Sequence, residues 1–316
     1  MNVRDFEYIS EIGRSGSILK ASRALYISQP ALSKFLQRIE DEAGTLLFQR
    51  VGHHLVPTFA GKECLRIANE ILFLNRQLEN TLSDIVHKNR GEIRFGLPLS
   101  RGSYFLSEIF PRFKALFPEM RINIFEDSTK ILLTKLRNGE LNLILINVTE
   151  KRYDELEYNI PGHEEMVIAA PEKFGLETKA FIHERYEFPC LKPEDWKDFP
   201  FIALSEDQMS YSFAEKYMIR EKISPVKVLK IRNLAQAMFA VQQGLGLTIC
   251  PSMPLGENYR DIRYFSLYDS NSDGKINVGI VHRKDAYISE AEKALMKLYA
   301  ESYSEHEADR KHLMIQ

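Results

Sequence analysis

The N-terminal region carries the pattern that most limits how this chain can fold, two short amphipathic helices joined by a three-residue turn. Ser17 is a suitable N-cap for a helix over 18–25, and the turn 26–28 leads into the next helix. Ser28 caps that next helix, Pro30 lies in its first turn, where a missing N–H costs nothing, and Gly44 ends it in a left-handed conformation. A preceding helix, predicted from residue 3 to residue 12, completes the pattern of a helix-turn-helix.

The helix that follows Ser28 has one apolar face and one polar face. The apolar side chains are expected to face the core: Leu32, Phe35, Leu36 and Ile39. The other face consists of Gln29, Pro30, Ser33, Lys34, Gln37 and Arg38. A Gln near a helix N-terminus can make paired hydrogen bonds to adenine, Lys can bind guanine or phosphate, and Pro can contact a thymine methyl. A solvated polar face is the alternative interpretation.

The charge pattern around this helix favours nucleic acid as its partner. Residues 12–39 contain no Asp or Glu, although the whole chain has a net charge of −2. The basic residues in that stretch are Arg14, Lys20, Arg23, Lys34 and Arg38. Two short strands are predicted next, around a Gly-containing turn, and they add Arg50 and His53 in a second segment without acids. A positive surface of this kind attracts the phosphate backbone, so the two strands are interpreted as a wing.

The segment from Ser17 to Gly61 resembles the winged helix-turn-helix of LysR-type transcriptional regulators. The signature of that family reads roughly S-x-x-x-A-A-x-x-L-x-x-S-Q-P-A-L-S-x-x-I-x-x-L-E, then L-F-x-R and L-T-x-A-G. The matching residues are Ser17, Ala21, Leu25, 28–33, Glu40, Leu47, Phe48, Arg50 and 58–61. Ser22, Phe35 and Pro57 depart from it, away from the expected base-reading face. The resemblance implies that a domain of residues 1–60 binds double-stranded DNA in a transcriptional regulator that contacts RNA polymerase.

A long helix is predicted from Thr58, its N-cap, to about Lys88, within a linker of residues 58–90. Apolar side chains recur along it at intervals of three and four: Cys64, Ala68, Ile71, Leu74, Leu78, Leu82 and Ile85. A stripe of this length needs a partner, so the sequence predicts a homodimer through this helix. Packing on its own chain is the alternative. In the family that the chain resembles, these helices pair and the dimers often associate into tetramers.

From Gly91 onward short apolar strands alternate with helices, which predicts a mainly parallel α/β sheet. Strands are expected at 92–97, 121–125, 141–146, 166–170, 201–204, 226–231, 247–250 and 276–281. Helices are expected at 103–117, 129–138, 210–222, 234–243 and 288–303. The region resembles the two-lobed α/β effector domain of LysR regulators, which is similar to periplasmic binding proteins. The resemblance implies lobe I at 91–163 and 267–303, lobe II at 164–266, and a tail at 304–316. The predicted fold class is therefore a multidomain α+β and α/β chain.

In that family a small ligand lies between the lobes, and a general rule selects candidate residues for it here. Ligands of open α/β sheets lie beyond the carboxyl ends of the strands, where helix N-termini direct N–H groups into the crevice. The rule selects Ser100, Arg101, Ser103, Ser128, Thr129, Asn147 and Thr149 in lobe I, and Ser205 and Thr248 in lobe II. Hydroxyl groups and helix N-termini favour a small anion such as a carboxylate, to which Arg101 would add charge. Ordinary helix capping is the alternative role for each residue.

Composition and missing motifs disfavour several other classes of protein. The chain of 316 residues is 44% hydrophobic and 27% charged, with no apolar run as long as a membrane span and no secretory signal. We therefore expect a cytoplasmic protein without membrane contact. Cys64, Cys190 and Cys250 are odd in number and far apart, so neither a disulfide framework nor a zinc site is expected.

Motifs for phosphate binding or catalysis are missing as well, so no enzyme activity and no cofactor beyond the small-molecule effector are expected. Two other functions stay open. One is a small-molecule binding or transport protein with a helical front end, and the other is an α/β enzyme with an N-terminal interaction module.

Overall fold

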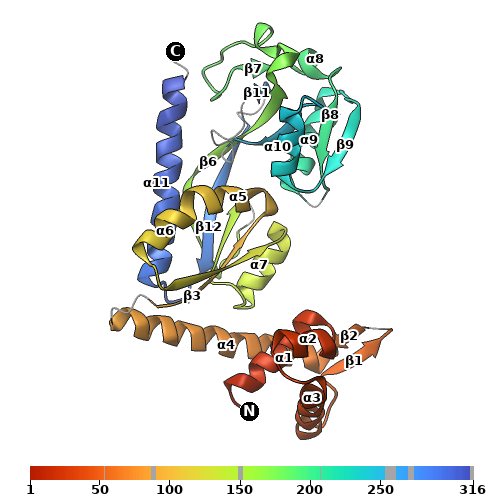
Figure 1. Cartoon of the computed structure of the whole chain (residues 1–316), viewed down its shortest axis with the longest axis vertical. Helices are drawn as coiled ribbons and strands as arrows, with labels where there is room; N and C mark the ends of the chain where they lie inside the picture. The colour runs from red at the N-terminus through yellow and green to blue at the C-terminus, as the bar shows by residue number, and fades with distance from the viewer. Residues whose placement is uncertain are drawn as a thin grey trace.

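The computed structural model describes residues 1–52, 54–86, 90–148, 152–206, 208–252, 261–269 and 274–313, and of 306–313 only the backbone. Figure 1 shows three parts: a small N-terminal head of residues 1–57, a long helix α4, and a two-lobed region that rises from the side of α4. The first of these lobes lies next to α4, and the second lies farther from it.

Three helices and a hairpin form the head: α1 Val3–Ser15, α2 Ile18–Ala24, α3 Gln29–Ala43, β1 Phe48–Val51 and β2 His54–Pro57. The predicted caps are confirmed. The Ser17 hydroxyl accepts the N–H of Lys20, the Ser28 hydroxyl accepts the N–H of Ala31, and Gly44 ends α3 at φ 66°. Of the predicted apolar stripe of α3, Leu32, Leu36 and Ile39 are buried, whereas Phe35 is half-buried at the edge of the core.

Helix α1 is longer than predicted, because Gly13 does not end it. A Cβ atom on Gly13 would lie 2.6 Å from Cδ2 of Leu65, so this glycine lets α1 approach α4 closely. The helix ends instead at Gly16, which has φ 59°. A close contact between two elements is invisible in a local sequence pattern, so the sequence predicts that the helix ends at residue 12, directly before this glycine.

Helix α4 spans Phe59–Ile85 and begins at the predicted cap Thr58, whose hydroxyl accepts the N–H of Gly61. One side of α4 packs on lobe I. There the Arg283 guanidinium binds both carboxylate oxygens of Glu70 at 2.7 and 2.9 Å and lies 4.5 Å from the centroid of the Phe73 ring. The other side leaves apolar side chains exposed: Leu74, Leu78, Leu82 and Ile85.

One sheet of eight strands runs through both lobes, in the order β4-β3-β5-β12-β6-β11-β7, with β10 paired to β6. Its strands are β3 Gly91–Leu97, β4 Met120–Glu126, β5 Leu143–Asn147, β6 Leu156–Pro171, β7 Cys190–Leu191, β10 Thr248–Pro251, β11 Ile262–Leu267 and β12 Lys275–Arg283. β8 Phe201–Leu204 and β9 Lys227–Ile231 form a separate parallel pair.

The sheet is mixed, so the prediction of a mainly parallel sheet was wrong. β3 runs parallel to β4 and β5, whereas β12 runs antiparallel to β5 and β6, and β10 and β11 run antiparallel to β6. The reason is that β6 passes through both lobes. Its Glu165 still faces Lys275 of β12, whereas its next residue, Met166, faces Pro251 of β10.

Helices cover the lobes: α5 Gly102–Tyr104, α6 Phe110–Leu116, α7 Thr129–Arg137, α8 Pro193–Trp196, α9 Met209–Glu221, α10 Leu234–Gln242 and α11 Glu290–Leu313. The single helix predicted at 103–117 is instead divided, because a π-helical turn, Phe105–Ile109, connects α5 to α6. Pro111 follows that turn and lacks the N–H that a regular α-helix needs. The segment that begins at Glu172 folds as two 3₁₀ turns, Glu172–Phe174 and Leu176–Thr178. None of the helices in the described ranges is long and apolar enough to cross a membrane.

Candidate functional sites: a recognition helix and a cavity between the lobes

The polar face of α3 is exposed as the sequence predicts, and most of it has no partner within the chain. All six predicted residues on it are exposed: Gln29, Pro30, Ser33, Lys34, Gln37 and Arg38. Over the part of the chain that the structure describes, the side chains of Gln29, Ser33, Lys34 and Gln37 make no hydrogen bond or ion pair. Their donors and acceptors are therefore available to a molecule outside the chain.

Arg38 differs from its neighbours on this face. Its guanidinium binds the Glu42 carboxylate at 2.8 Å, lies 3.6 Å from Asp5, and covers the Phe35 ring at 5.5 Å. These contacts compensate part of its charge. Within the described part of the chain, Lys34 has no ion-pair partner, and it lies about one turn from the N-terminus of α3.

Charge is distributed unevenly along α3. The first turn contains no acid, whereas Glu40, Asp41 and Glu42 gather in the last turn. The helix dipole is positive at the N-terminal end, so dipole and side chains together favour an anion there. Glu40 also has a structural role, because its carboxylate accepts the N–H groups of Leu47 at 2.7 Å and Phe48 at 3.0 Å and ties α3 to the wing.

The predicted wing is present as the hairpin β1–β2, in which Arg50 faces Leu55. Arg50 is exposed, and no ion pair involves it among the described residues. Gly52 takes φ 61° in the hairpin turn. His53, which the sequence also assigned to the positive surface, lies outside the described residues. The head thus presents Lys34 and Arg50 as two separate exposed cations.

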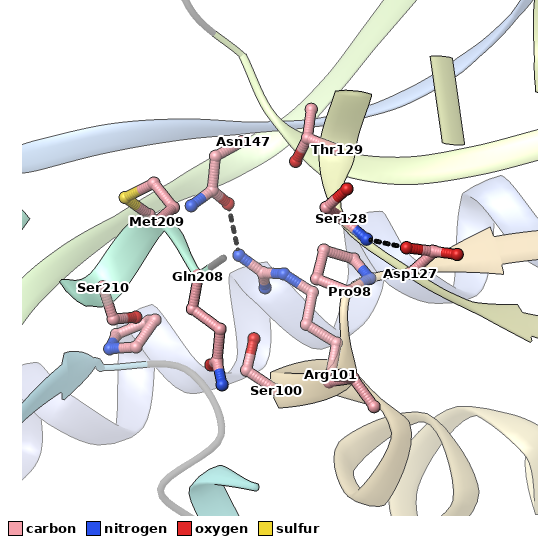
Figure 2. Close-up of a pocket in the computed structure, with 12 residues that line it drawn as sticks. Pro98, Ser100, Arg101, Asp127, Ser128, Thr129, Asn147, Gln208, Met209 and Ser210 are labelled. Atoms are coloured by element: carbon pink, nitrogen blue, oxygen red, sulfur yellow. Dashed lines mark hydrogen bonds between the residues drawn. The ribbon is translucent and has the colours of Figure 1, made fainter. Parts of the chain in front are cut away.

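A cavity of about 50 Å³ lies between the two lobes. Its walls are formed by Pro98, Leu99, Ser100, Arg101, Asp127, Ser128, Thr129, Asn147, Gln208, Met209, Ser210 and Pro251, most of which Figure 2 labels. Five residues predicted from strand ends are thus brought together: Ser100, Arg101, Ser128, Thr129 and Asn147. The cavity is small compared with ordinary ligand pockets of roughly 300–1,000 Å³. It fits a small polar group in this arrangement of the lobes.

Three other predicted residues do not line this cavity. Ser103 is exposed on α5, and Ser205 is half-buried after β8. Thr248 is fully buried, because its hydroxyl donates to the carbonyl oxygen of Ile202 at 2.8 Å inside lobe II. Thr149 lies outside the described residues. A strand end thus fixes the neighbourhood of a residue, but the direction of its side chain depends on the following turn.

Two helix N-termini meet at the cavity, one from each lobe. Ser128 is the N-cap of α7 and Gln208 is the N-cap of α9, and neither side chain caps its own helix. Instead the Asp127 carboxylate accepts the N–H of Ser128 at 2.8 Å, as Figure 2 shows. Uncapped N-termini leave backbone N–H groups that favour an anion. Two such N-termini, one from each lobe, therefore border the cavity.

The sequence predicts that Arg101 adds positive charge for an anion. In the structure the charge of Arg101 is already compensated within the chain. Its guanidinium binds both carboxylate oxygens of Glu164, one at 2.8 Å, and donates to Asn147 Oδ1 at 2.5 Å. The Tyr303 hydroxyl donates to the same Glu164 carboxylate at 2.7 Å. Burial alone would lower the pKa of Arg101, but the charge of Glu164 raises it above its ordinary value. Arg101 therefore stays charged and paired at the edge of the cavity.

Sequence reasoning missed two groups of site residues. Glu164 and Tyr303, which hold Arg101, come from β6 and α11, far from any strand end that the rule selects. A signal was present for Glu164: two adjacent acids, Glu164 and Glu165, stand directly before the strand expected at 166–170. Gln208 and Met209 were missed because α9 was predicted to begin at Ser210, two residues after its actual N-cap.

The cysteine thiols have no activated character. Burial raises the pKa of Cys190 and of Cys250 to about 12, and it also raises the pKa of Cys64. Thiolate is the reactive form of cysteine, so all three are expected to react slowly near neutral pH. Over the described ranges no three His, Cys, Asp or Glu side chains gather as metal ligands would.

The chain is similar to known regulators along nearly its whole length. The HTH-type transcriptional regulator CysB of Haemophilus influenzae is 30% identical over 258 residues, which cover 80% of this chain and 76% of that protein. YcgK of Bacillus subtilis, described as an uncharacterized HTH-type transcriptional regulator, is 26% identical over 318 residues, which cover 96% of this chain and 95% of that protein.

Solved structures have the same fold. A full-length OxyR variant from Pseudomonas aeruginosa superimposes with a TM-score of 0.67 at 19% identity, covering 96% of this chain and 97% of that one. Full-length CbnR, solved in complex with its target DNA, superimposes with a TM-score of 0.62 at 16% identity, covering 96% of this chain and 100% of that one. At these identities the likeness concerns the fold alone.

Two family models match separate parts of the chain. Residues 3–62 match the bacterial regulatory helix-turn-helix protein of the lysR family, and residues 87–304 match the LysR substrate binding domain. The first match covers the head with helix α3, and the second covers both lobes and the cavity between them. The chain therefore belongs to the LysR family of transcriptional regulators, with a DNA-binding helix-turn-helix domain and an effector-binding domain.

Proposed function

We propose that this regulator reads a specific DNA sequence with the N-terminal half of α3 and responds to a small anion held between its lobes. The observation that carries the first part is the row of exposed, unpartnered polar groups on α3, with Lys34 at its centre. We assign the DNA contacts to Gln29, Pro30, Ser33, Lys34, Gln37, Arg38, Arg50 and His53. Gln29 and Ser33 would contact base edges, whereas Lys34 and Arg50 would neutralise phosphates.

Two copies of the chain would act together on DNA. The exposed apolar side of α4 supports a homodimer through this helix, and a tetramer of such dimers is the larger assembly we propose. A dimer places two recognition helices in successive major grooves, so the half-sites would lie about one helical turn apart. CbnR, which has the same fold, was solved in complex with its target DNA, which supports DNA as the partner of such a chain. We propose that the bound oligomer acts on RNA polymerase, in the cytoplasm.

The division of the chain follows from this role. We propose a DNA-binding domain at 1–60, a linker at 58–90, lobe I at 91–163 and 267–303, lobe II at 164–266, and a tail at 304–316, of which residues 304–313 continue α11. The change of strand partners at Glu165 and Met166 supports a boundary between the lobes near residue 164.

A small carboxylate is the effector class that the cavity favours. Because Glu164 compensates Arg101, the attraction would come from the uncapped N-termini of α7 and α9 and from the hydroxyl groups of Ser100 and Thr129. One ligand group would thus contact helices from both lobes. A ligand that binds one lobe angle better than another shifts the population toward that angle. The lobe angle would in turn set the spacing of the heads on DNA.

Salt-dependent binding to duplex DNA tests the proposed DNA surface. Affinity for the DNA upstream of the chain's own gene should fall steeply as salt rises, because bound Lys and Arg release counterions from DNA. Lys34→Ala and Arg50→Ala should each weaken binding and reduce the slope of log K against log salt by about 1. Lys197→Ala in lobe II, which removes an exposed lysine far from the head, is the matched control. Unchanged binding and slope in both head variants would refute the assignment.

A thermal-shift screen tests the proposed effector site. Among small carboxylates and amino-acid-like compounds, at least one should raise the midpoint of thermal unfolding, because a ligand that binds only the folded state stabilises it. Ser100→Ala and Thr129→Ala should lose most of that shift, whereas Ser103→Ala, which alters an exposed hydroxyl outside the cavity, should keep it. A ligand whose shift survives both cavity variants would place the effector site elsewhere.

A further inference from the structure

Tyr26 has a backbone conformation and an exposure that the fold of the head does not explain. It lies in the turn between α2 and α3 at φ 54°, and its side chain is 96% exposed. Residues other than Gly, Asn and Asp rarely adopt positive φ, and a bulky residue there is strained. The turn of a helix-turn-helix often contains Gly, which takes this conformation freely.

The turn around Tyr26 is held by its backbone, not by the tyrosine ring. The N–H of Tyr26 donates to the carbonyl oxygen of Arg23 at 3.3 Å, and the N–H of Ile27 donates to that of Ser22 at 3.0 Å. The Tyr26 hydroxyl has no hydrogen-bond partner among the described residues, and its ring has no aromatic or cationic partner there. A glycine would satisfy the same backbone with less strain and less exposed apolar surface. Folding therefore gives no reason for a tyrosine at this position.

The position of Tyr26 indicates what its side chain contacts. It precedes the N-terminus of α3 by three residues and lies within the acid-free stretch 12–39, near the exposed side chain of Arg23. In a bound helix-turn-helix the N-terminal residues of the second helix contact base edges, and the first helix crosses the sugar–phosphate backbone. The turn that joins the two helices is therefore expected at the edge of the groove, beside that backbone. Tyrosine is one of the side chains that bind DNA phosphates through a hydrogen bond.

We propose that Tyr26 is a DNA-backbone contact, whose hydroxyl donates a hydrogen bond to a phosphate oxygen beside the groove that α3 enters. This contact would fix the angle and depth of α3 in the groove without reading a base. The proposal rests on the proposed DNA-binding role of α3, and it names the residue that orients that helix. It distinguishes Tyr26 from Lys34, because tyrosine is neutral and its phosphate contact releases no counterion.

The test compares Tyr26→Phe and Tyr26→Ala with the wild-type full-length chain on two duplexes, its own upstream DNA and a scrambled sequence of the same length. Both variants should bind each duplex roughly 3- to 10-fold more weakly, the range expected for one lost hydrogen bond. The ratio of the two affinities and the salt slope should not change, because neither a base contact nor a charge is lost. The midpoint of thermal unfolding should stay within about 3 °C, since the side chain is exposed. Phe239→Ala, which removes an aromatic ring that is 60% exposed in lobe II, is the matched control and should bind as the wild type does.

The outcomes separate this inference from the proposed function. If the wild type binds duplex DNA and both Tyr26 variants bind equally well, the inference is wrong while the DNA-binding role of α3 stands. Unchanged DNA binding together with a lost transcription response would assign Tyr26 to a protein partner and would also overturn the inference. If the wild type shows no salt-dependent binding at all, the proposed function itself fails. A large fall in the unfolding midpoint would show that the ring supports the fold, which again contradicts the proposal.

Discussion

Glu165 is a buried acid at the point where β6 leaves lobe I and enters lobe II. Its Oε2 accepts the N–H of Glu187 at 2.9 Å, whereas its Oε1 has no hydrogen-bond partner within the described residues. The pKa of Glu165 is raised to about 7, chiefly by burial and to a smaller extent by the charge of Glu187. Hydrogen bonds from the Ser266 side chain and the Glu187 backbone, together with the charge of Lys275, oppose part of this rise. The neutral form is therefore the one that the fold prefers.

Stability should depend on pH through this residue. Because the pKa rises from 4.5 to about 7 on folding, the stability contributed by the neutral form is fully present below pH 4.5 and is lost as pH rises through 7. Glu165→Gln keeps a neutral group at every pH. At pH 8 the variant should be more stable than the wild type by on the order of 2 kcal/mol, and the difference should shrink toward pH 5. Chemical denaturation of both proteins at pH 5 and pH 8 measures this difference in the free energy of unfolding. An equal difference at the two pH values would contradict the assigned pKa.

At the scale of elements, α4 is a helix whose apolar side chains are only partly covered by its own chain. Leu78 and its exposed apolar neighbours form a strip on the side of the helix that lobe I does not cover. If two chains pair through this strip, Leu78→Glu buries an unpaired charge at the interface and should shift the protein toward monomer in analytical ultracentrifugation. Arg66→Ala, on a polar part of the same helix, should keep the wild-type mass. A Leu78→Glu chain that sediments like the wild type would exclude α4 as the dimer interface.

The helices and strands also show which features of the fold a local sequence pattern can predict. The caps at Ser17, Ser28 and Thr58 and the exposed face of α3 could be predicted, because capping and helical periodicity depend on neighbours within about one turn. Most of β6 could not, because its N-terminal part carries Glu164 and Glu165, and only the tertiary fold supplies the Arg101 charge that pairs with Glu164 and the burial that favours neutral Glu165. The pairing of Arg101 with Glu164 was hidden for the same reason, since it joins two segments that only the tertiary fold brings together.

At the scale of the whole molecule, the head and the cavity lie at opposite ends of one connected path. The cavity contacts both lobes, lobe I is tied to α4 through Arg283 and Glu70, and α4 begins directly after the wing of the head. Figure 1 shows this succession from lobe II down to the head. A change of lobe angle would therefore reach the recognition helices through α4, where two chains are proposed to meet.

The sequence preference of Gln29→Ala tests the central claim, that the exposed face of α3 reads bases, most directly. The measured quantity is the ratio of affinities for the chain's own upstream duplex and a scrambled duplex, for wild type and variant at one salt concentration. We predict that the variant loses about 1–3 kcal/mol of discrimination while its affinity for the scrambled duplex stays close to that of the wild type. An unchanged ratio would show that this face of α3 does not read the sequence.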